Sequence, residues 1–342
     1  MAIVGLDIGD KSFRAVELEV QKGNYNILNF GQFENSQLDR SKISSTKELY
    51  KSALKSFFSE FGFSTAGVIV GLSDANVFMR VLTLPKMNDS DLKKTIDFES
   101  QQYIPIPINQ VNITYQKLDF DNVEKGKMQV QIVAAKIDKL KDYVEILRGA
   151  NLIPLAIEPE TYSISRAISN VQDDYANIIV CIGFSTTLVI VVHKGIVFFT
   201  RTIPVGGDII TKALQQKLDI EYPQAEEYKR AYGLDKSHFD GKIYEIIKPV
   251  VDNIVYEIKR AILFFSKDNS NIKIKRAIIT GGSVKLPDLL IYLVNTLGIE
   301  VVIGDCLKNM TFSPKIQNIK NMILDNQNQY STAVGLAMKG IY

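Results

Sequence analysis

The feature that most constrains the fold is an internal repeat of a strand–glycine turn–strand unit. Residues 3–24 read "IVGLDIGDKSFRAVELEVQKGN", and residues 178–196 read "IIVCIGFSTTLVIVVHKGI". Each segment contains a strand that ends in Ile-Gly, a short polar turn, a second strand of β-branched residues and a Lys-Gly turn. A third strand follows each unit, over 25–34 and 196–203. The repeat predicts two similar lobes within one chain.

The bulk composition limits the classes of function. The chain has 342 residues, which is enough for two lobes with cores of their own. A net charge of +2 gives no support to a nucleic-acid partner, and two histidines cannot build a histidine-rich metal site. Two cysteines without a disulfide framework fit a reducing compartment.

Direct insertion into a membrane is not expected. The N-terminus "MAIVGLDIGDKSF" lacks the basic and apolar regions of a signal peptide. The longest apolar region, 177–199, is interrupted by hydroxyl residues, His193 and Lys194, and therefore indicates strands. We expect a cytoplasmic protein that would reach a membrane only through a partner.

Helical and strand patterns alternate after each repeat. In the first half the expected elements are a helix within 41–60, a strand over 67–72, a helix capped by Asp89 or Ser90 and ended by the prolines of 104–107, a strand over 128–137, and a helix capped by Asp138 and ended by Gly149. Residues 81–154 should form a compact strand–helix–strand–helix unit inserted in the first lobe. In the second half the expected elements are a helix opened by the glycine turn of 205–214, helices over 223–232 and 243–268, a strand, Gly-Gly turn and helix over 275–298, and a terminal helix.

The first glycine turn, "GLDIGDKS" (5–12), has the composition of a phosphate-binding hairpin. Gly9 permits close approach of the backbone to a ligand, and Lys11 and Ser12 can donate hydrogen bonds to an anion. Asp7, at the end of the strand, could hold Mg²⁺ through a water molecule. A plain hairpin with a solvated acid explains this stretch equally well when it is considered alone.

The second glycine turn, "CIGFSTT" (181–187), matches the first. Aligning Gly9 with Gly183 places Cys181 at the position of Asp7. Hydroxyl groups are supplied by Ser185, Thr186 and Thr187. A lone hairpin is the commoner structure, but two matching hairpins that face each other across a cleft could clamp one polyphosphate.

Two further segments carry weaker signals. The Gly-Gly turn of "TGGSVKLPDLL" (280–290) would let a flat ring lie against the backbone, and the following helix start favours anions. Glu226 and Lys229 are three residues apart on an expected helix, so they share a face and could contact ribose and adenine. Many strand–helix turns use Gly-Gly, however, and an exposed ion pair is the more frequent explanation of Glu226 and Lys229.

The order of the two Gly hairpins, the Gly-Gly turn and a terminal "AVGLAM" resembles the actin-like ATPase superfamily, which includes actin, sugar kinases, heat-shock chaperones and FtsA. The chain is more specifically similar to the PilM family, the actin-like cytoplasmic proteins of type IV pilus assembly. This resemblance covers nearly the whole chain. Its most specific segments are "RVLTLPKMNDSDLKKTIDFESQQYIPIPINQVNITYQ" (80–116) and "VAAKIDKLKDYVEILRGANLIPLAIEPETYSISRA" (133–167).

The resemblance implies an α/β fold, the actin-like (ribonuclease H-like, duplicated) two-lobed fold with an FtsA/PilM-type inserted subdomain. The implied subdomains are IA (1–80 and 155–175, with the terminal helix 331–342 packing back), the inserted IC (81–154), IIA (176–213 and 272–330) and IIB (214–271). ATP or ADP with Mg²⁺ would lie between the lobes, and Asp7 would hold the metal through water. The implied nucleotide contacts are Asp7, Gly9, Asp10, Lys11, Ser12, Gly183, Phe184, Ser185, Thr186, Thr187, Gly206, Gly207, Glu226, Lys229, Gly281, Gly282 and Ser283.

The same resemblance implies a partner. In PilM-like proteins the groove between subdomains IA and IC binds the short N-terminal cytoplasmic peptide of PilN, a bitopic membrane protein. Such a peptide is extended and apolar, so a groove with exposed backbone and side-chain pockets would suit it. The protein would then be peripheral to the inner membrane, and other pilus inner-membrane and motor components, or further copies of the chain, are additional candidate partners.

One position departs from the family pattern. The second hairpin usually starts with Asp, whereas this chain has Cys181. A neutral thiol, with an ordinary pKa of about 8.5, is a poor ligand for Mg²⁺. No general base is evident in "IPVGGD" (203–208), unless Asp208 serves. We therefore expect nucleotide binding with slow or absent hydrolysis.

Two alternatives belong to the same superfamily. The first is an FtsA-like division protein or a secretion-system relative; FtsA reaches the membrane through a C-terminal amphipathic helix, which "GLAMKGIY" does not provide. The second is a small-molecule kinase, which would need a catalytic Asp at a substrate pocket. The sequence shows no such Asp, and Cys181 argues further against a kinase.

Overall fold

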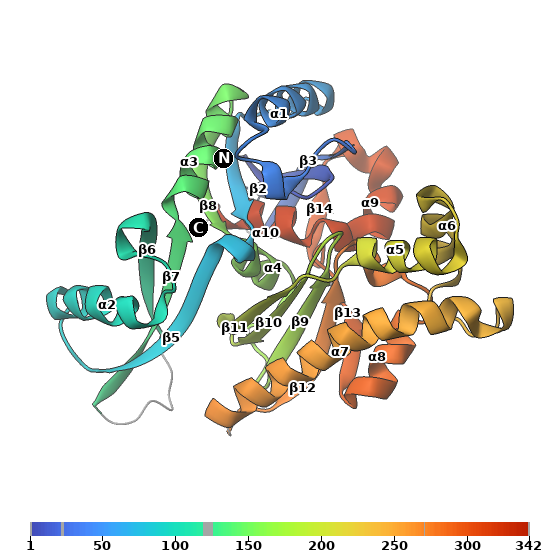
Figure 1. Ribbon diagram of the computed structural model, residues 1–342. Coiled ribbons are helices and arrows are strands. Elements are labelled where there is room, and N and C mark those ends of the chain that lie inside the picture. Colours follow the sequence, from blue (N-terminus) through green and yellow to red (C-terminus); the bar gives the residue numbers. More distant parts are fainter. Residues whose placement is uncertain (1, 22–23, 119–125, 270, 341–342) are drawn as a thin grey trace.

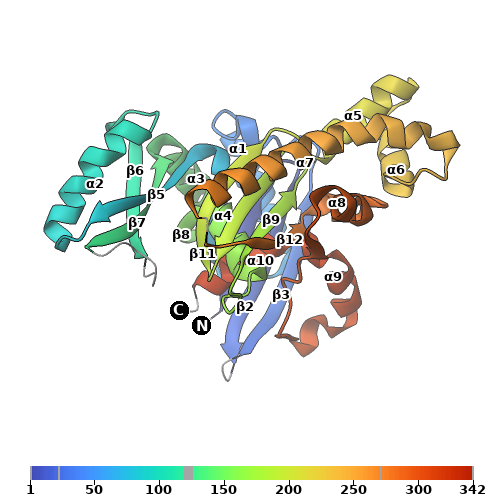
Figure 2. The same ribbon diagram turned by 90° about the horizontal axis from the view of Figure 1, so that it is seen from below.

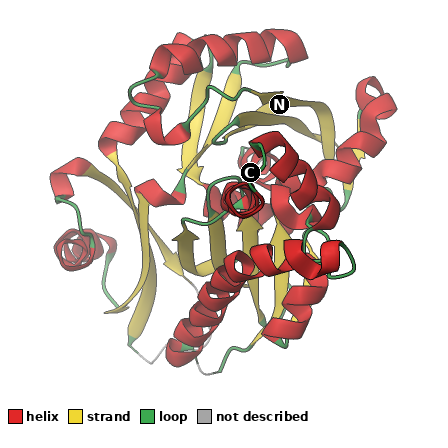
Figure 3. Ribbon diagram, turned by 45° about the vertical axis from the view of Figure 1, so that its right-hand side comes forward, coloured by secondary structure: helices red, strands yellow, loops and turns green. Residues whose placement is uncertain are grey.

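Three β-sheets organise the chain, and the computed structural model describes them within residues 2–21, 24–118, 126–269 and 271–340 (Figure 1). Two larger sheets each form the centre of a lobe, and a smaller sheet projects from the first lobe. Helices cover both faces of the two larger sheets (Figure 3). None of the helices in the described ranges combines the length and apolarity needed to cross a bilayer.

The sheet of the first lobe has the strand order β14-β3-β2-β1-β4-β8. Its strands are β1 (Ile3–Ile8), β2 (Ser12–Gln21), β3 (Asn24–Glu34), β4 (Gly67–Leu72), β8 (Ile153–Pro159) and β14 (Met310–Phe312). Strand β1 is antiparallel to β2 and parallel to β4. Both β1 and β4 are buried along their whole length, which explains why their sequences are nearly continuous apolar runs.

The sheet of the second lobe has the order β11-β10-β9-β12-β13. Its strands are β9 (Ala176–Ile182), β10 (Thr187–His193), β11 (Ile196–Ile203), β12 (Ile274–Thr280) and β13 (Glu300–Ile303). Strand β9 is antiparallel to β10 and parallel to β12. Apart from the extra edge strand β14, the two sheets have the same order and the same directions, so the predicted duplication is confirmed.

The two glycine hairpins also agree in hydrogen bonding. Gly9 N donates to Ser12 O at 2.9 Å, and Gly183 N donates to Thr186 O at 2.9 Å. A Cβ added at either glycine would lie 3.0 Å from the same carbonyl oxygen. The alignment of Gly9 with Gly183, made from the sequence, is therefore the structural alignment as well.

Two short helices cross between the lobes. Helix α4 (Glu160–Ile168) places Ile164 in an apolar cluster under the second sheet, and α10 (Ser331–Lys339) packs on β1, β2 and β4 of the first sheet. The two helices approach so closely that a Cβ at Gly335 would lie 1.8 Å from the carbonyl oxygen of Ser163. Arg166 Nη1 fastens the crossing, because it donates to Gly335 O at 2.5 Å.

Four helices cover the outer face of the second sheet. They are α5 (Gly207–Leu218), α6 (Tyr222–Tyr232), the 27-residue α7 (Lys242–Asp268) and α8 (Leu289–Leu297). Helices α7 and α8 pack on the strands of the sheet, and α5 and α6 pack against α7 and line the space between the lobes. Helix α7 runs along the second lobe, and its C-terminal end points toward the side of the molecule that carries α2 (Figure 2). The helices expected over 223–232 and 243–268 are thus confirmed, as is the helix that follows the Gly-Gly turn.

The inserted unit contains a three-stranded sheet with the order β5-β7-β6 and one helix. Its elements are β5 (Val77–Pro85), α2 (Asp89–Tyr103), β6 (Val111–Leu118) and β7 (Lys127–Lys136). The expected cap of α2 is wrong, because the side chain of Asn88, rather than of Asp89 or Ser90, accepts from Asp91 N at 3.0 Å. Strand β6 was not expected, since its outward side chains weaken the apolar signal.

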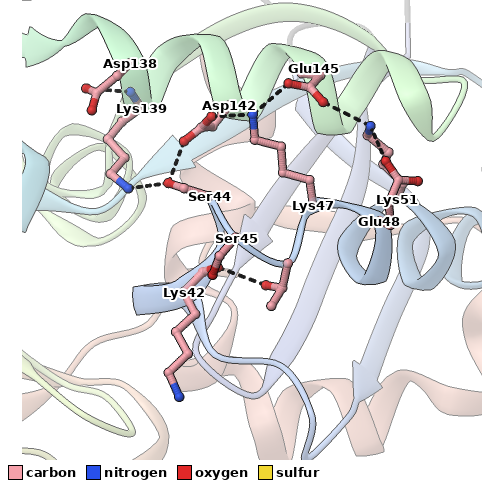
Figure 4. A network of polar contacts seen from close by, with 11 residues as sticks. Lys42, Ser44, Ser45, Lys47, Glu48, Lys51, Asp138, Lys139, Asp142 and Glu145 are labelled. Carbon is pink, nitrogen blue, oxygen red and sulfur yellow. Dashed lines mark hydrogen bonds and ion pairs between the residues drawn. The ribbon is translucent and has the colours of Figure 1, made fainter.

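Helix α3 (Ile137–Gly149) packs against α1 (Lys47–Phe61) of the first lobe. It buries Tyr143, Ile146 and Leu147 in the core of that lobe. Ion pairs reinforce the contact, with Lys47 Nζ 2.7 Å from Asp142 and 2.7 Å from Glu145 (Figure 4). Asp138 lies in the first turn of α3 and is not its cap, since the N-cap position is Lys136. The subdomain boundaries remain a prediction, and this packing leads us to propose that the inserted unit ends near Lys136 rather than at residue 154.

Candidate functional site

The two glycine hairpins face a cleft of about 1230 Å³ between the lobes. Fourteen of the seventeen predicted nucleotide contacts line it: Asp7, Gly9, Asp10, Lys11, Ser12, Gly183, Phe184, Thr186, Gly207, Glu226, Lys229, Gly281, Gly282 and Ser283. These residues come from five separate segments of the sequence: 7–12, 183–186, 207, 226–229 and 281–283. A Cβ at Gly207 would lie 2.8 Å from Ser283 Oγ and 3.5 Å from Lys229 Nζ, so three of the segments converge at this glycine.

Three predicted contacts are not among the residues that line the cleft. Thr187 is fully buried and donates its hydroxyl to Val205 O at 2.7 Å, so it supports the hairpin and does not face the cleft. Gly206 is the N-cap residue of α5, and a Cβ there would lie 2.4 Å from Phe184 O. Ser185 is half-buried and is not among the residues that line the cleft.

The tips of both hairpins offer backbone donors. Within the described residues, the amides of Asp10 and Lys11 have no backbone acceptor, and neither do those of Phe184 and Ser185. Successive free amides at a tight turn form a concavity that binds anions. Lys11 Nζ donates to Ser36 O at 2.9 Å, which holds this ammonium beside the first tip.

The start of α5 locks the second hairpin in place. Gly207 N donates to Gly183 O at 3.0 Å, and Asp208 N donates to Phe184 O at 2.9 Å. These two amides are therefore not available to a phosphate group. Their role is to fix the hairpin against the helix, which keeps the free amides of the hairpin tip pointing away from α5.

Glu226 and Lys229 form an ion pair in the cleft wall rather than on the open surface. Lys229 Nζ lies 2.5 Å from Glu226 Oε2, and the two side chains are only 12% and 24% exposed. Thr211 donates its hydroxyl to the same carboxylate at 2.6 Å. Burial lowers the pKa of Lys229. Burial also opposes the shift of Glu226, but hydrogen bonds from Lys229 and Thr211 hold its pKa below the usual value.

The Gly-Gly turn brings the second lobe close to the last part of the chain. Gly281 has φ +93° and ψ 174°, a conformation open almost only to glycine. A Cβ there would lie 2.4 Å from Ile182 O. Gly281 N donates to Asn328 O at 3.0 Å. By contrast, a Cβ at Gly282 would meet nothing within 4 Å, so Gly282 is open to the cleft.

Sequence reasoning missed two charged residues at the centre of the cleft. Arg40 begins the short helix η1 (Arg40–Lys42), and Glu160 begins α4. Arg40 Nε lies 3.1 Å from Asp10 Oδ1, and Arg40 Nη1 donates to Glu160 Oε1. Neither residue lies in a glycine-rich motif, so only the folded chain brings them to the first hairpin. Arg14, whose Nη2 donates to Gln329 Oε1 at 3.0 Å, was also missed.

The carboxyl and thiol at the strand ends are strongly affected by burial. Burial, followed by the charge of Glu160, raises the pKa of Asp7 to about 7, although Arg14 and Arg40 oppose the shift. Burial, with the same Glu160 and Asp7, raises the pKa of Cys181 to about 12. The Cys181 side chain therefore stays a neutral thiol at physiological pH.

Asp208 is engaged by two partners. The hydroxyl of Tyr222 donates to Asp208 Oδ1 at 2.9 Å, and Lys212 Nζ lies 2.6 Å from Asp208 Oδ2. Both carboxylate oxygens are therefore already engaged, and Asp208 holds α5 and α6 together through Lys212 and Tyr222.

The residues present fit a nucleotide better than they fit a metal ion. The cleft exceeds the usual 300–1,000 Å³ of ligand pockets and combines glycine turns with free amides and hydroxyls. Mg²⁺ needs several oxygen ligands in octahedral geometry. The second lobe offers a thiol at Cys181, and the carboxylates of Asp10 and Glu160 are already bound to Arg40. Of the acids at this end of the cleft, Asp7 has no such ion pair.

A second buried carboxyl, Asp74, caps α4 from outside the helix. It accepts from Thr161 N at 3.0 Å and from the Thr161 hydroxyl. Burial, followed by the charge of Glu160, raises its pKa from 3.8 to about 7. Because the folded pKa lies above the unfolded value, the folded state retains a proton that the unfolded state releases. The stabilisation from this proton is complete below about pH 4 and is lost as the pH rises through about 7.

We expect Asp74→Asn to flatten this pH dependence. Between pH 5 and pH 8 the wild-type protein should lose about 2 kcal/mol of unfolding free energy relative to the variant. Urea unfolding at both pH values measures the difference. Asp89→Asn, at the exposed start of α2, is the control and should follow the wild type. Equal pH profiles for Asp74→Asn and the wild type would contradict the assignment.

Comparison with known proteins gives one consistent family. A family profile described as "Type IV pilus assembly protein PilM" matches residues 5–341. The solved structure titled "PilM-PilN type IV pilus biogenesis complex" is similar with a TM-score of 0.83, at 22% identity over 99% of this chain and 98% of that chain.

More distant actin-like proteins are similar as well. The ADP-bound MreB5 of Spiroplasma citri matches with a TM-score of 0.57 and 12% identity, over 98% of this chain and 95% of that one. The cell division protein FtsA of Enterococcus hirae is 24% identical over 255 residues, which is 67% of this chain and 57% of FtsA. The chain thus matches less than two thirds of the length of FtsA, and the structural likenesses at these identities show a shared actin-like fold.

Proposed function

Because the chain belongs to the PilM family of type IV pilus assembly proteins, we propose that it binds ATP or ADP between its lobes and docks the N-terminal cytoplasmic peptide of a PilN-like membrane protein. It would act as an assembly platform in the cytoplasm, held at the inner membrane by that partner. Hydrolysis of the nucleotide would be slow or absent. Other inner-membrane and motor components, and further copies of this chain, are the remaining candidate partners.

The observation that carries the nucleotide part is the pair of matching glycine hairpins on one cleft. Each hairpin closes with the same hydrogen bond and leaves amides free at its tip, one from each lobe. The Glu226–Lys229 pair and the Gly-Gly turn lie along the same cleft, where an adenosine group would follow the phosphates. A single hairpin would be unremarkable, whereas two that face one cleft form a two-sided anion site.

The expectation of slow hydrolysis rests on the groups that would activate water. Cys181 is a neutral thiol, and Asp208 is held by Tyr222 and Lys212. Glu160 lines the cleft but is bound to Arg40. Glu160 and Asp208 are thus hydrogen-bonded to other side chains, whereas a general base must be positioned against the attacking water. The cleft therefore contains groups suited to binding a nucleotide, whereas the side chains that could activate water for hydrolysis are neutral or engaged in other contacts.

The peptide part of the proposal rests on the similarity to the PilM–PilN complex and on the position of the inserted unit. The unit is joined to the first lobe through β5 and through the β7–α3 connection. At its base, Gln131 of β7 accepts from the hydroxyl of Tyr162 in α4 at 2.7 Å and donates to Val197 O of β11. The inserted unit is thus a separate sheet held against α4 and the edge strand of the second lobe, and the proposed peptide groove would lie between this unit and the first lobe.

Titration with a synthetic N-terminal peptide of a PilN-like protein tests the proposal. Calorimetry should show binding with ATP present, and no binding of a scrambled peptide of the same composition. Hydrogen exchange should become slower in β5, β7 and the adjacent first lobe, and stay unchanged in α7. No binding with or without nucleotide would overturn the peptide part, and turnover of ATP at about 10 per second, typical of metabolic enzymes, would overturn the expectation of slow hydrolysis.

A further inference from the structure

We propose that the guanidinium group of Arg40 supplies the positive charge that lets this cleft bind a nucleoside polyphosphate without a divalent metal ion. The inference rests on the proposed nucleotide binding and adds a specific requirement to it. A polyphosphate bound against carboxylates is repelled unless a cation stands between them. In this cleft the side chain of Arg40 lies between two acids, Asp10 and Glu160.

Arg40 is held between the first hairpin and the start of α4. Its Nε lies 3.1 Å from Asp10 Oδ1, its Nη1 donates to Glu160 Oε1, and Nη1 also lies 3.4 Å from Ile8 O. The side chain is 14% exposed and lines the cleft. Arginine presents its donors as a planar fork, so it can bind two carboxylates and still offer N–H groups to a phosphate.

Both carboxylates that Arg40 binds lie near Asp7, the residue expected to hold a metal ion. Asp10 lies at the tip of the first hairpin, and Glu160 opens α4 on the same side of the cleft. Both of these acids are in ion pairs with Arg40. At the position of the second lobe that matches Asp7, the chain has the thiol of Cys181 rather than a carboxylate. A thiol beside two occupied carboxylates does not make an oxygen cage for Mg²⁺.

The charges along the cleft are balanced without a metal ion. Six cationic and six acidic side chains line it. Arg14 and Lys11 stand beside the first hairpin and donate to neutral groups, the amide of Gln329 and the carbonyl of Ser36. These two cations, together with Arg40, line the same cleft as the two hairpins. A polyphosphate there would meet three cationic side chains of the first lobe and no unpaired acid of the second.

Calorimetric titration of the full chain with ATP, and with adenosine, tests the inference. Each titration is run once in EDTA and once with millimolar Mg²⁺. For the wild type we expect ATP affinities that agree within about 3-fold in the two conditions, which is less than 1 kcal/mol. ATP binding that weakens more than about 10-fold in EDTA would overturn the inference while leaving nucleotide binding intact. No binding of ATP in either condition would overturn the proposed nucleotide site and this inference with it.

Two variants separate the charge of Arg40 from its packing. Arg40→Gln should weaken ATP binding in EDTA by about 10-fold or more, as expected for loss of charge-assisted hydrogen bonds, and leave adenosine binding within about 2-fold. Adding Glu160→Gln to Arg40→Gln should recover metal-free ATP binding, because the exposed acid is removed. Arg276→Gln removes a comparable ion pair, with Glu300, at the far end of β12 and is the control.

Thermal unfolding of each variant checks that the chain is folded before titration. Should Arg40→Gln be unstable, Arg40→Lys keeps the charge without the planar fork, and an intermediate loss of ATP affinity is expected. Unchanged metal-free ATP affinity in a folded Arg40→Gln would overturn the inference. Equal losses for ATP and adenosine would also overturn it, because they would indicate a purely structural role for Arg40.

Discussion

Replacing Gly335 by alanine is expected to destabilise the protein by about 3 kcal/mol or more. Gly335 lies inside α10, where alanine normally stabilises a helix by about 1 kcal/mol relative to glycine. The sign reverses here because a Cβ would lie 1.8 Å from the carbonyl oxygen of Ser163 and 2.4 Å from its carbonyl carbon. Both contacts are with backbone atoms of α4, so α10 must move away from α4 to admit a methyl group.

Urea unfolding at constant pH measures the effect, and Gly149→Ala is a matched control. Gly149 is also a helix residue, at the end of α3, and a Cβ there would lie 2.7 Å from Lys51 Cδ. That contact is with the side chain of Lys51 rather than with backbone, so a shift of the side chain can relieve it. We expect Gly149→Ala to change the free energy of unfolding by about 0.5 kcal/mol or less. Equal effects of the two substitutions would show that the α4–α10 contact is looser than the structure indicates.

The consequence of Gly335→Ala extends beyond stability. Helix α4 packs under the second sheet and α10 under the first, so their crossing fixes how the lobes meet. The first residue of α4 is Glu160, the partner of Arg40 in the cleft. A shift of α4 away from α10 would therefore change the separation of the two hairpins as well. A folded fraction of this variant should bind ATP more weakly than the wild type at the same temperature.

The fold could be predicted from the sequence because its repeat is local and visible. Each hairpin needs a glycine at one position, flanked by strands of buried residues, and that pattern occurs twice at the same spacing. The helices that follow also carry strong periodic patterns. The two sheets also have the same strand order. The sequence alignment of Gly9 with Gly183 therefore matches two turns that close with the same hydrogen bond.

The parts that could not be predicted depend on contacts between distant segments. Arg40 and Glu160 are 120 residues apart and neither lies in a glycine-rich motif, yet they form an ion pair in the cleft. Helix α3 follows the inserted sheet in sequence, but its apolar face fits the core of the first lobe. A local sequence pattern predicts the periodicity of an element and its caps. It does not predict the surface on which the element packs, because that depends on segments distant in the sequence.

Three predicted nucleotide contacts are not among the residues that line the cleft, and this too could not be read from the sequence. Ser185, Thr187 and Gly206 match the family motif, but the motif does not say which side chains of a hairpin face the ligand. Alternation along β10 turns Thr187 inward, toward Val205. A sequence motif therefore predicts which loop would face a ligand, whereas the direction of each side chain in that loop is set by the strand register.

The substitution Cys181→Asp should make ATP binding depend on Mg²⁺. A carboxylate at residue 181 would lie near Asp7 and Glu160, whose charges already act on the thiol. Without metal, a third acid would repel the polyphosphate, and we expect ATP affinity in EDTA to fall by about 10-fold or more. With millimolar Mg²⁺, the new carboxylate and Asp7 would together supply oxygen ligands from both lobes, and the affinity should return to the wild-type level or exceed it.

Cys181→Asn is the matched control, since it has the size of the aspartate variant without its charge, and it should bind ATP equally with and without Mg²⁺. Hydrolysis should rise only in the aspartate variant and only with Mg²⁺, because a second carboxylate would position the metal beside the terminal phosphate. If affinity and hydrolysis both stay at wild-type values in Cys181→Asp, residue 181 does not limit metal use. Arg40 would then exclude the metal by itself, since its ion pairs with Asp10 and Glu160 would persist in that variant.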